Sequence, residues 1–594
     1  MASATTPLLA DDRRNVDDSR MSDSEDEALR GQSAATHSGR SLYLRLREVL
    51  LFVWALLATA GILILAVWIS HHQQTSFQKP SGKRNLVFMV SDGMGPASLS
   101  LTRSFRQHVE GLEYGDTLTL DKHFWGSSRT RSSSSLVTDS AAGATAFGCA
   151  KKSYNGAIAM LPDHTPCGTV LEAAKRAGYM TGLVVTTDIT DATPACFSSH
   201  VGYRLEESSI ALQQIGKGAL NRTVDLMFGG GRCHFLPSSD PRSCREDDVD
   251  VVKIATEEFG WNYISDRPAF DEFWEGQKDV PLPMMGLFAD HDIPFELDRR
   301  NMNDIYPSLS EMAKTALRTL EKATEGSEKG FFLMIEGSRI DHAGHGNDPA
   351  AQVREVLEYD KTVAAVLEFL DESSAEGVMV ATSDHETGGL SVAKQLHADY
   401  PQYLWYPAVL ANASSSSEYL AIKLLQHLAD NSLSSAEADM ASLSEDELAH
   451  LKKYINDELV VKGLGIIDAT PEELNTLVLY PAISQYSFAQ MISNRAQIGW
   501  STHGHSAVDV NIYSSGGPGT DAIRGNVENT QIGEFLQHYL GVDTQEVTRI
   551  LKADKESKAK VTAGEPVLQS ERVEEVDHWV AHEAQVGLAA VSAL

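Results

Sequence analysis

A serine between an acidic residue and a run of small residues is the first feature of this sequence that could do chemistry. Ser140 follows Asp139 and precedes the small residues 141–146. This composition is typical of a loop that enters a helix, with the hydroxyl at the positive end of that helix. The hydroxyl could act as a nucleophile once its proton is removed, and no triad spacing is evident nearby. Metal ions could remove that proton instead, so the rest of the sequence should contain ligands that bind them.

Each of four expected strands ends just before an acidic residue. The strands are expected at residues 85–90, 179–187, 330–335 and 377–381, and the acidic residues after them are Asp92, Asp191, Glu336 and Asp384. In open α/β sheets, sites form where the carboxyl ends of strands meet their loops, so these carboxylates would gather in one crevice. Their charges would repel one another, and bound cations would relieve that repulsion.

Histidines near these carboxylates have metal-ligand spacing. Asp341 and His345 are four residues apart, which on a helical turn places carboxylate and imidazole on one face. His385 directly follows the acidic residue after the fourth strand, and residues 502–505 add two imidazoles. Sets of Asp and His suit zinc, whereas carboxylates with a threonine hydroxyl, here Thr193, suit magnesium. A lone histidine would indicate a surface or core residue, but the combined set indicates a metal centre.

The elements that must position these residues predict an α/β domain. Helical periodicity at 169–177, 308–322 and 350–370 alternates with the short buried strands, a pattern typical of a largely parallel central sheet flanked by helices. The stretch from about 391 to 500 is less regular and is expected to form an inserted cap subdomain. Residues 546–594 carry many charges and are expected to form a loosely packed C-terminal extension.

In their order along the chain, these motifs resemble the alkaline phosphatase family over residues 85–545, the expected catalytic domain. The matching segments are Asp92–Gly95, Thr138–Ala141, Asp191–Ala195, Glu336–His345, Ser383–Gly389 and Thr502–Gly504. The N-terminal tail and anchor are similar to those of the fungal vacuolar members in particular. The resemblance implies hydrolysis of small phosphate monoesters through a phosphoserine intermediate, a homodimer, and two zinc ions with one magnesium ion as cofactors.

The resemblance also implies a role for each site residue. Ser140 would be the nucleophile, and Arg204 would hold two phosphate oxygens through its planar guanidinium. The implied ligands are Asp341, His345 and His503 for the first zinc, Asp384 and His385 for the second zinc, and Thr193 and Glu336 for magnesium, with Asp191 beside the magnesium and Asp92 bridging it to the second zinc. No role is carried over to His342 or His505.

Residues 49–69 form an apolar segment without charge that matches the thickness of a bilayer core. A cleaved signal peptide is the alternative, but the segment is too long for one and begins too far from the start of the chain. We therefore expect a single transmembrane helix between a disordered cytosolic tail (1–48) and a polar stalk (70–84), with the catalytic domain lumenal. Glycosylation sequons at Asn221 and Asn412 agree with that side, and the family resemblance places the anchor in the vacuolar membrane.

The overall charge and the cysteines restrict the remaining interpretations. The 594 residues carry a net charge of −32, which argues against nucleic acid as a partner but not against a small phosphorylated substrate beside bound metal ions. Cys233 and Cys244 lie close together in a polar loop and could form a disulfide. We expect Cys149, Cys167 and Cys196 to be buried thiols, and an odd cysteine count leaves at least one of the five unpaired within the chain.

Two alternatives to a phosphomonoesterase stay open. One is another metal-dependent esterase with the same core, such as a phosphodiesterase. The other is an inactive, membrane-anchored binding protein, which would usually have lost the nucleophile or a ligand. Every one of the motif residues is present here.

Overall fold

The computed structural model describes residues 37–75, 82–400, 402–433 and 443–562. The chain divides into two units, Met1–Gln78 and Lys79–Leu594, and each is described here by itself.

The described part of the first unit is one helix, α1 (His37–Thr75). Its segment Leu46–Leu65 has a mean hydropathy of 2.4, and among the described residues α1 is the one helix long and apolar enough to cross a membrane. This segment overlaps the expected span of 49–69. The tail expected as disordered is helical from His37 onward, because leucine and arginine before the apolar segment favour helix. The rest of that tail, residues 1–36, lies outside the described residues.

The expected bounds of the stalk, residues 70–84, also differ from the structure at both ends. Residues 70–75 continue α1, residues 76–81 lie outside the described residues, and Arg84 already begins the first strand.

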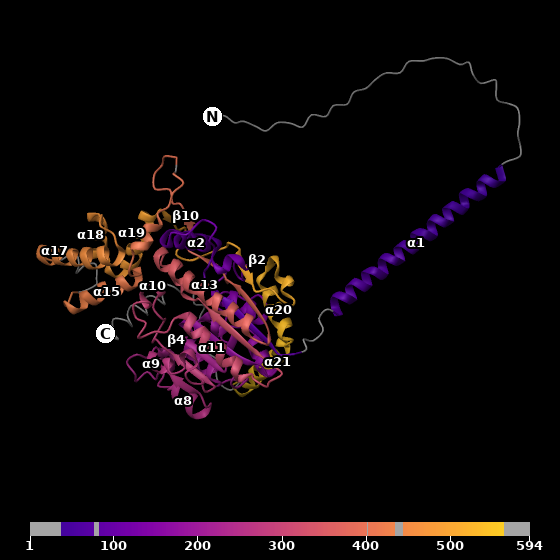
Figure 1. The fold of residues 1–594 in the computed structure, drawn as a ribbon. Helices are drawn as coiled ribbons and strands as arrows, with labels where there is room; N and C mark the ends of the chain where they lie inside the picture. Colours follow the sequence, from indigo (N-terminus) through magenta and orange to yellow (C-terminus); the bar gives the residue numbers. More distant parts are fainter. Residues whose placement is uncertain (1–36, 76–81, 401, 434–442, 563–594) are drawn as a thin grey trace, which may run out of the picture. The chain divides into compact units, whose positions relative to one another are not determined.

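The second unit is built on a ten-stranded sheet (Figure 1). Seven neighbouring strands run parallel to one another. In spatial order they are β8 (Glu376–Thr382), β1 (Arg84–Val90), β7 (Phe331–Glu336), β3 (Met180–Asp188), β4 (Leu226–Gly230), β6 (Met284–Leu287) and β5 (Asn262–Ile264). Beyond β8, the antiparallel β13 (Val510–Ser514) connects the sheet to β2 (Phe124–Arg129) and the edge strand β14 (Gly525–Glu528). The predicted α/β fold with a largely parallel sheet is confirmed.

Helices cover both faces of the sheet, and alternate residues of its strands pack into two separate cores. In β1, Leu86, Phe88 and Val90 belong to one core, whereas Val87 and Met89 belong to the other. The first core includes α4 (Ser140–Cys149), α5 (Val170–Arg176) and α20 (Asn529–Leu540), and the second includes α11 (Leu309–Ala323) and α13 (Pro349–Glu372). Because both faces are buried, the central strands read as continuous apolar runs.

Shorter helices complete the layers around the sheet. They are α2 (Pro96–Glu110), α3 (Thr119–Lys122), α6 (Ala192–Ser198), α7 (Glu207–Ile215), α8 (Val251–Glu258), α9 (Arg267–Asp271), α10 (Glu296–Arg299) and α12 (Arg339–His345).

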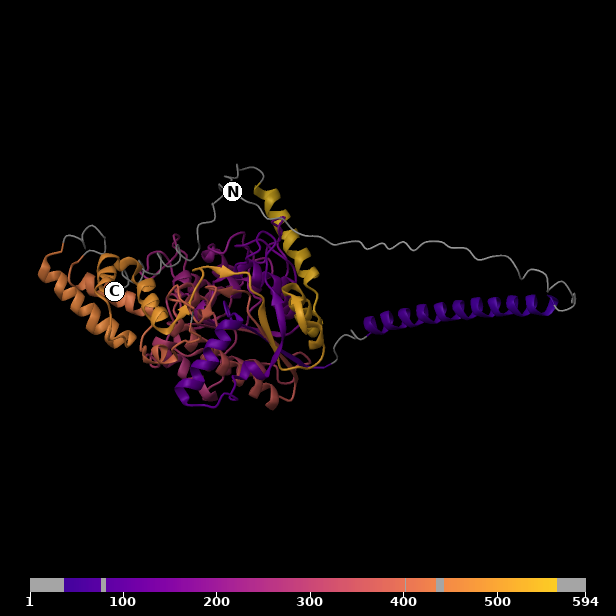
Figure 2. The same ribbon diagram turned by 90° about the horizontal axis from the view of Figure 1, so that it is seen from above.

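The expected insertion is a helical subdomain whose core is shared with α2, α10 and α13 of the main fold. It is closed at its base by the antiparallel pair β10 (Ser391–Val392) and β11 (Ile498–Gly499). Its helices are α14 (Pro407–Asn412), α15 (Ser417–Asp430), α17 (Glu445–Tyr454), a π-helical stretch (Ile455–Leu464), α18 (Pro471–Leu479) and α19 (Ser484–Ala496). Figures 1 and 2 place these helices at the opposite end of the domain from α20. Leu420, Leu424 and Phe488 fill the subdomain core, which also includes Phe105 of α2.

The C-terminal extension begins with a packed helix, α21 (Thr544–Thr562). Val547 and Leu551 bury against Ala173 of α5, and Thr548 Oγ1 accepts a hydrogen bond from the Gly168 backbone at 2.8 Å. The packed part of the second unit therefore continues past residue 545, at least as far as Leu551. Residues 563–594 lie outside the described part of the chain.

The cysteines form two disulfides, Cys233–Cys244 and Cys149–Cys167. The first agrees with the sequence interpretation. The expectation of buried thiols at Cys149 and Cys167 is wrong, because the chain between them folds back and brings both sulfurs together in apolar surroundings. Cys196 is a free, buried thiol, as expected.

Candidate active site

The site lies at the carboxyl ends of β1, β3, β7 and β8, which are consecutive neighbours in the sheet in the order β8, β1, β7, β3. Parallel pairing brings all four ends to the same edge, so the acidic residues that follow these strands converge there. This convergence affects Asp92. Burial, followed by the charges of Asp384, Asp341 and Glu336, raises the pKa of its carboxyl well above the usual range.

Ser140 is the first residue of α4, as its sequence context predicts. Asp139 caps the helix, and its Oδ1 accepts a hydrogen bond from the Ala142 backbone at 3.0 Å. The Ser140 side chain is buried, and its Oγ lies 3.0 Å from His385 Nε2. Gly143 permits this close approach of α4, because a Cβ there would stand only 2.9 Å from the Asp384 side chain.

A first group of potential metal ligands surrounds His385. Its Nε2 lies 3.4 Å from Asp92 Oδ1 and 3.3 Å from Asp384 Oδ2. Both of these carboxylate oxygens are buried without a hydrogen bond from any described residue. Burial and the charge of Asp341 raise the pKa of Asp384 to about 7, and burial lowers the pKa of His385 well below its usual range. A neutral imidazole and two unsatisfied carboxylate oxygens are the donors that a cation requires.

The arrangement is not that of a serine–histidine–aspartate triad. In a triad the carboxylate holds the ring nitrogen opposite the serine. Here the nitrogen opposite Ser140 is His385 Nδ1, which lies 3.1 Å from Thr387 Oγ1 and 3.9 Å from Asp341 Oδ1. The two nearer carboxylates instead converge on the same nitrogen as the serine, as ligands do around an ion.

A second group of potential ligands is formed by Asp341, His345 and His505. His345 Nε2 lies 3.2 Å from Asp341 Oδ2 and 3.1 Å from His505 Nε2. In both rings the Nδ1 atom faces a backbone carbonyl. His345 Nδ1 faces the carbonyl of His503, and His505 Nδ1 lies 2.8 Å from the carbonyl oxygen of Thr138. Carbonyls only accept hydrogen bonds, so both Nδ1 atoms carry a proton, and both Nε2 atoms lie toward the Asp341 carboxylate. A cation bound there would take these two nitrogens and the carboxylate as ligands.

The structure corrects the residue expected to complete this group. His503 was the expected ligand, but it is exposed, its Nδ1 lies 2.8 Å from the His345 carbonyl, and its ring packs against Tyr486. His505 takes the inward position because the short strand β12 (His505–Ser506) pairs with β9 (Glu386–Thr387), which stacks its ring on that of His385 at 3.5 Å. The sequence signal for this ligand was the presence of two histidines, His503 and His505, and the pairing of β12 with β9 decides which of them joins the group.

A third group lies beside Asp92 and consists of Asp191, Thr193 and Glu336. Asp191 caps α6, whose first turn carries Thr193, and Thr193 Oγ1 is buried without a hydrogen bond from the described residues. Burial raises the pKa of Glu336 to about 8, although Ser338 donates a hydrogen bond to it at 2.7 Å. Carboxylate and hydroxyl oxygens are the donors that magnesium prefers.

Arg204 lies between Asp191 of this third group and Asp139, the residue before Ser140. Its Nη2 donates to Asp191 Oδ1 at 2.7 Å, and its Nη1 lies 3.8 Å from Asp139 Oδ2. Burial alone would lower the pKa of the guanidinium, but the charges of Asp191 and Asp139 outweigh it and raise the pKa. Arg204 is therefore a fixed positive charge next to Ser140.

His342 is a histidine to which the family resemblance assigned no role. Its Nδ1 lies 3.1 Å from a carboxylate oxygen of Asp292.

Comparison with known proteins gives one consistent result. The family model described as alkaline phosphatase matches residues 83–542. The chain is 51% identical over 514 residues to the repressible alkaline phosphatase of Saccharomyces cerevisiae, covering 83% of this chain and 88% of that protein. It is 45% identical to the alkaline phosphatase of Schizosaccharomyces pombe, covering 84% and 90%. The crystal structure of a cold-active alkaline phosphatase from Shewanella sp. superposes with a TM-score of 0.61 at 28% identity, covering 77% of this chain and 99% of that chain.

Proposed function

Because the chain belongs to the alkaline phosphatase family and is an alkaline phosphatase, we propose that it hydrolyses phosphate monoesters through a phosphoserine formed on Ser140. One observation carries the proposal: Ser140 Oγ, at the start of α4, lies 3.0 Å from the nitrogen on which Asp92 and Asp384 converge. A serine hydroxyl held against a cation site is a nucleophile that needs no neighbouring general base.

The donor sets of this chain fit two zinc ions and one magnesium ion. The unsatisfied, buried oxygens of Asp92, Asp384 and Thr193 support this assignment. We assign the first zinc to Asp341, His345 and His505, the second to Asp92, Asp384 and His385, and magnesium to Asp92, Thr193 and Glu336 with Asp191 beside it. When bound, such ions lower the pKa of a hydroxyl or a water and offset charge on phosphate oxygens.

The chemistry proceeds in two balanced displacements at phosphorus. Ser140 Oγ forms a bond to phosphorus as the ester oxygen leaves, and the alcohol takes up a proton. The oxygen of a water molecule then forms a bond to phosphorus as the bond between Ser140 Oγ and phosphorus breaks. One proton of that water ends on Ser140 Oγ, and inorganic phosphate is released. Arg204 holds phosphate oxygens through its fork and offsets their charge in both steps. The N-terminus of α4 adds backbone N–H groups beside the anion.

We also propose that α1 anchors the enzyme in the vacuolar membrane, with the catalytic domain in the lumen as a glycosylated homodimer. Two disulfides support a compartment outside the cytosol, since disulfides are rare in reducing cytosol. Asn221 and Asn412 of the two sequons are both exposed, which glycosylation requires. The choice of the vacuolar membrane rests on the resemblance of the N-terminal tail and anchor to those of the fungal vacuolar members.

The test is covalent trapping of the phosphoryl group on Ser140. Full-length enzyme in detergent is incubated with labelled inorganic phosphate, quenched in acid and digested for mass spectrometry. We expect label on Ser140, no label and no turnover in Ser140→Ala, and unchanged metal content in that variant. Ser133→Ala is the matched control, because Ser133 is an exposed serine of the same segment. Full turnover in Ser140→Ala would exclude the proposal. Rates on aryl phosphate, aryl phosphodiester and aryl sulfate separate it from the other esterases.

A further inference from the structure

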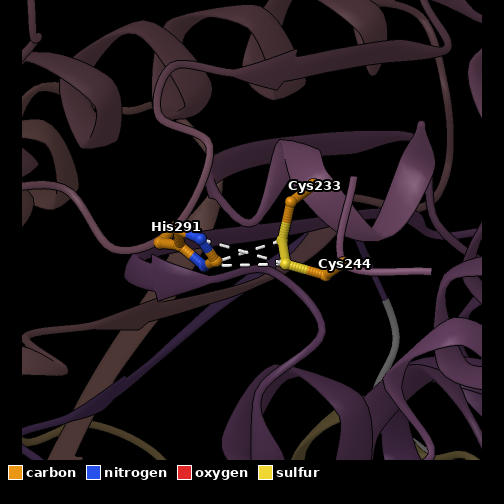
Figure 3. A group of neighbouring side chains, drawn as sticks. All are labelled: Cys233, Cys244 and His291. Atoms are coloured by element: carbon orange, nitrogen blue, oxygen red, sulfur yellow. Dashed lines mark hydrogen bonds between the residues drawn. A yellow bond between two sulfur atoms is a disulfide. The ribbon is translucent and has the colours of Figure 1, made fainter. Parts of the chain in front are cut away.

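A disulfide and an imidazole lie together at the carboxyl ends of β4 and β6, outside the active site. His291 Nδ1 lies 3.6 Å from Cys233 Sγ and 3.8 Å from Cys244 Sγ. Figure 3 shows the ring facing both sulfur atoms of the disulfide. The three donor atoms lie within 4.8 Å of one another. Two cysteine sulfurs and one imidazole form a donor set that suits zinc and other soft metal ions.

The backbone holds these residues together independently of the disulfide. Three hydrogen bonds of 2.9 to 3.1 Å connect residues 231–233 with residues 289–291, one from each N–H group of the first segment. The Cys244 N–H group donates to the Cys233 carbonyl at 3.1 Å. Opening the bond between the sulfurs would therefore leave both of them beside the imidazole of His291. The donor set is preorganised by the ends of two neighbouring strands.

The geometry matches what a tetrahedral zinc ion requires. With Zn–S near 2.3 Å and Zn–N near 2.1 Å, the tetrahedral angle separates nitrogen from sulfur by about 3.6 Å. The observed separations of His291 Nδ1 from the two sulfurs are 3.6 and 3.8 Å. Only the two sulfurs must move apart, and breaking their covalent bond allows that movement.

Access to the two sulfurs differs. Cys233 is completely buried, whereas Cys244 is exposed. A reductant can therefore attack the Cys244 sulfur, and Cys233 becomes the leaving thiol. The same exposure leaves room for a water molecule as a fourth ligand.

We propose that Cys233, Cys244 and His291 form a zinc site that reduction opens. A dithiol reductant transfers two electrons and two protons to the disulfide, which yields two cysteine thiols and the oxidised reductant. Zn²⁺ then displaces the two thiol protons and binds both thiolates and His291 Nδ1. In the oxidised protein the sulfurs are bonded to each other and no thiolate is present, so the site has no affinity for zinc.

The ligand chemistry of this site separates it from the active site. The active-site groups offer carboxylate, imidazole and hydroxyl donors, and none offers sulfur. The other disulfide, Cys149–Cys167, is not joined by a histidine in any potential metal-binding group of the described residues. A signal specific to metal–thiolate bonds therefore comes from outside the active site. Cys233 also stands beside Asp188 and His234 in another potential metal-binding group, so the variant His291→Ala decides which group binds, and the Cys149 pair provides a matched control.

The experiment uses cobalt as a spectroscopic probe for zinc. Full-length protein in detergent is reduced with dithiothreitol, desalted under argon and titrated with Co²⁺. We expect a thiolate-to-cobalt charge-transfer band in the near ultraviolet, with one equivalent per chain, that is absent before reduction and disappears when Zn²⁺ is added. The double variant Cys149→Ser/Cys167→Ser should retain this band, and Cys233→Ser/Cys244→Ser should lose it. His291→Ala, which keeps the cysteines, should bind cobalt at least tenfold more weakly.

Either of two results would overturn the proposal. The first is no charge-transfer band in reduced wild-type protein in which mass spectrometry shows both Cys233 and Cys244 as free thiols. The second is a band of equal strength and affinity in His291→Ala. Phosphatase activity of each oxidised variant verifies folding, since these residues lie outside the active site. The outcome does not depend on the phosphoserine mechanism, because the readout is the metal–sulfur band.

Discussion

Replacing His505 and His503 by alanine, one at a time, tests the central assignment of the active site. His505 Nε2 lies 3.1 Å from His345 Nε2 in the Asp341 group, so His505→Ala removes one of three protein ligands. His503 contributes its backbone carbonyl to His345 Nδ1, and that carbonyl survives in His503→Ala. The two variants thus remove neighbouring imidazoles with opposite expected consequences.

The magnitudes follow from what each ring contacts. Removing a group that merely orients a metal-bound histidine costs about 10–100-fold in metal affinity, so losing a ligand should cost at least about 100-fold. For His505→Ala we expect zinc affinity to fall by at least that factor, with turnover restored only at high zinc. For His503→Ala, which loses packing on Tyr486, we expect less than about tenfold.

The assay is a competition between the enzyme and a chromophoric chelator of known zinc affinity, with metal content measured after dialysis. Turnover of an aryl phosphate is followed in parallel as a function of added zinc. Tight zinc binding in His505→Ala together with loss of zinc in His503→Ala would refute the geometric argument. Equal losses in both variants would refute the claim that only the backbone of His503 matters.

Three further predictions follow from other contacts. Arg204→Ala should lower kcat/KM by about 10²–10³-fold in steady-state kinetics, because one preorganised donor to the phosphate is lost; a fall below tenfold contradicts its role. His234 contacts Asp188 at 3.1 Å and Glu207 at 3.0 Å, and these charges outweigh burial and raise its pKa to about 10. Its stabilisation is complete below pH about 6.5 and is lost as the pH rises through about 10, so the Tm should fall over that range less steeply in His234→Gln; identical Tm profiles would disprove this. Reducing only the Cys149–Cys167 pair, or replacing both by serine, should destabilise the domain by about 3 kcal/mol in denaturant unfolding, as expected for a loop closed over 18 residues.

Much of the fold could be predicted from local patterns in the sequence. The strands β1, β7 and β8 are short apolar runs buried on both faces, and helical periodicity between such runs indicates parallel crossovers. Carboxylates directly after those strands then have to meet, because parallel strands end at the same edge of the sheet. Ser140 was predictable for the same kind of reason, since Asp139 caps the helix that it begins.

The features that could not be predicted depend on pairings between distant segments. The sulfurs of Cys149 and Cys167 meet because their segments fold together, and their apolar surroundings are equally compatible with thiols. The start of α1 and the packing of α21 depend on where a helix can continue, which is the least certain part of a sequence pattern.

The choice between His503 and His505 shows how tertiary pairing decides chemistry. Residues two apart in a strand share a face, so periodicity alone gives both imidazoles the same direction. The strand β12 begins only at His505, where it pairs with Thr387, and His503 stands before it in a bend. Pairing with β9 carries His505 onto His385, so one short antiparallel contact aligns the two proposed zinc groups with each other. The ligand set is therefore a property of the β9–β12 pair, and disrupting that pair should impair both groups together.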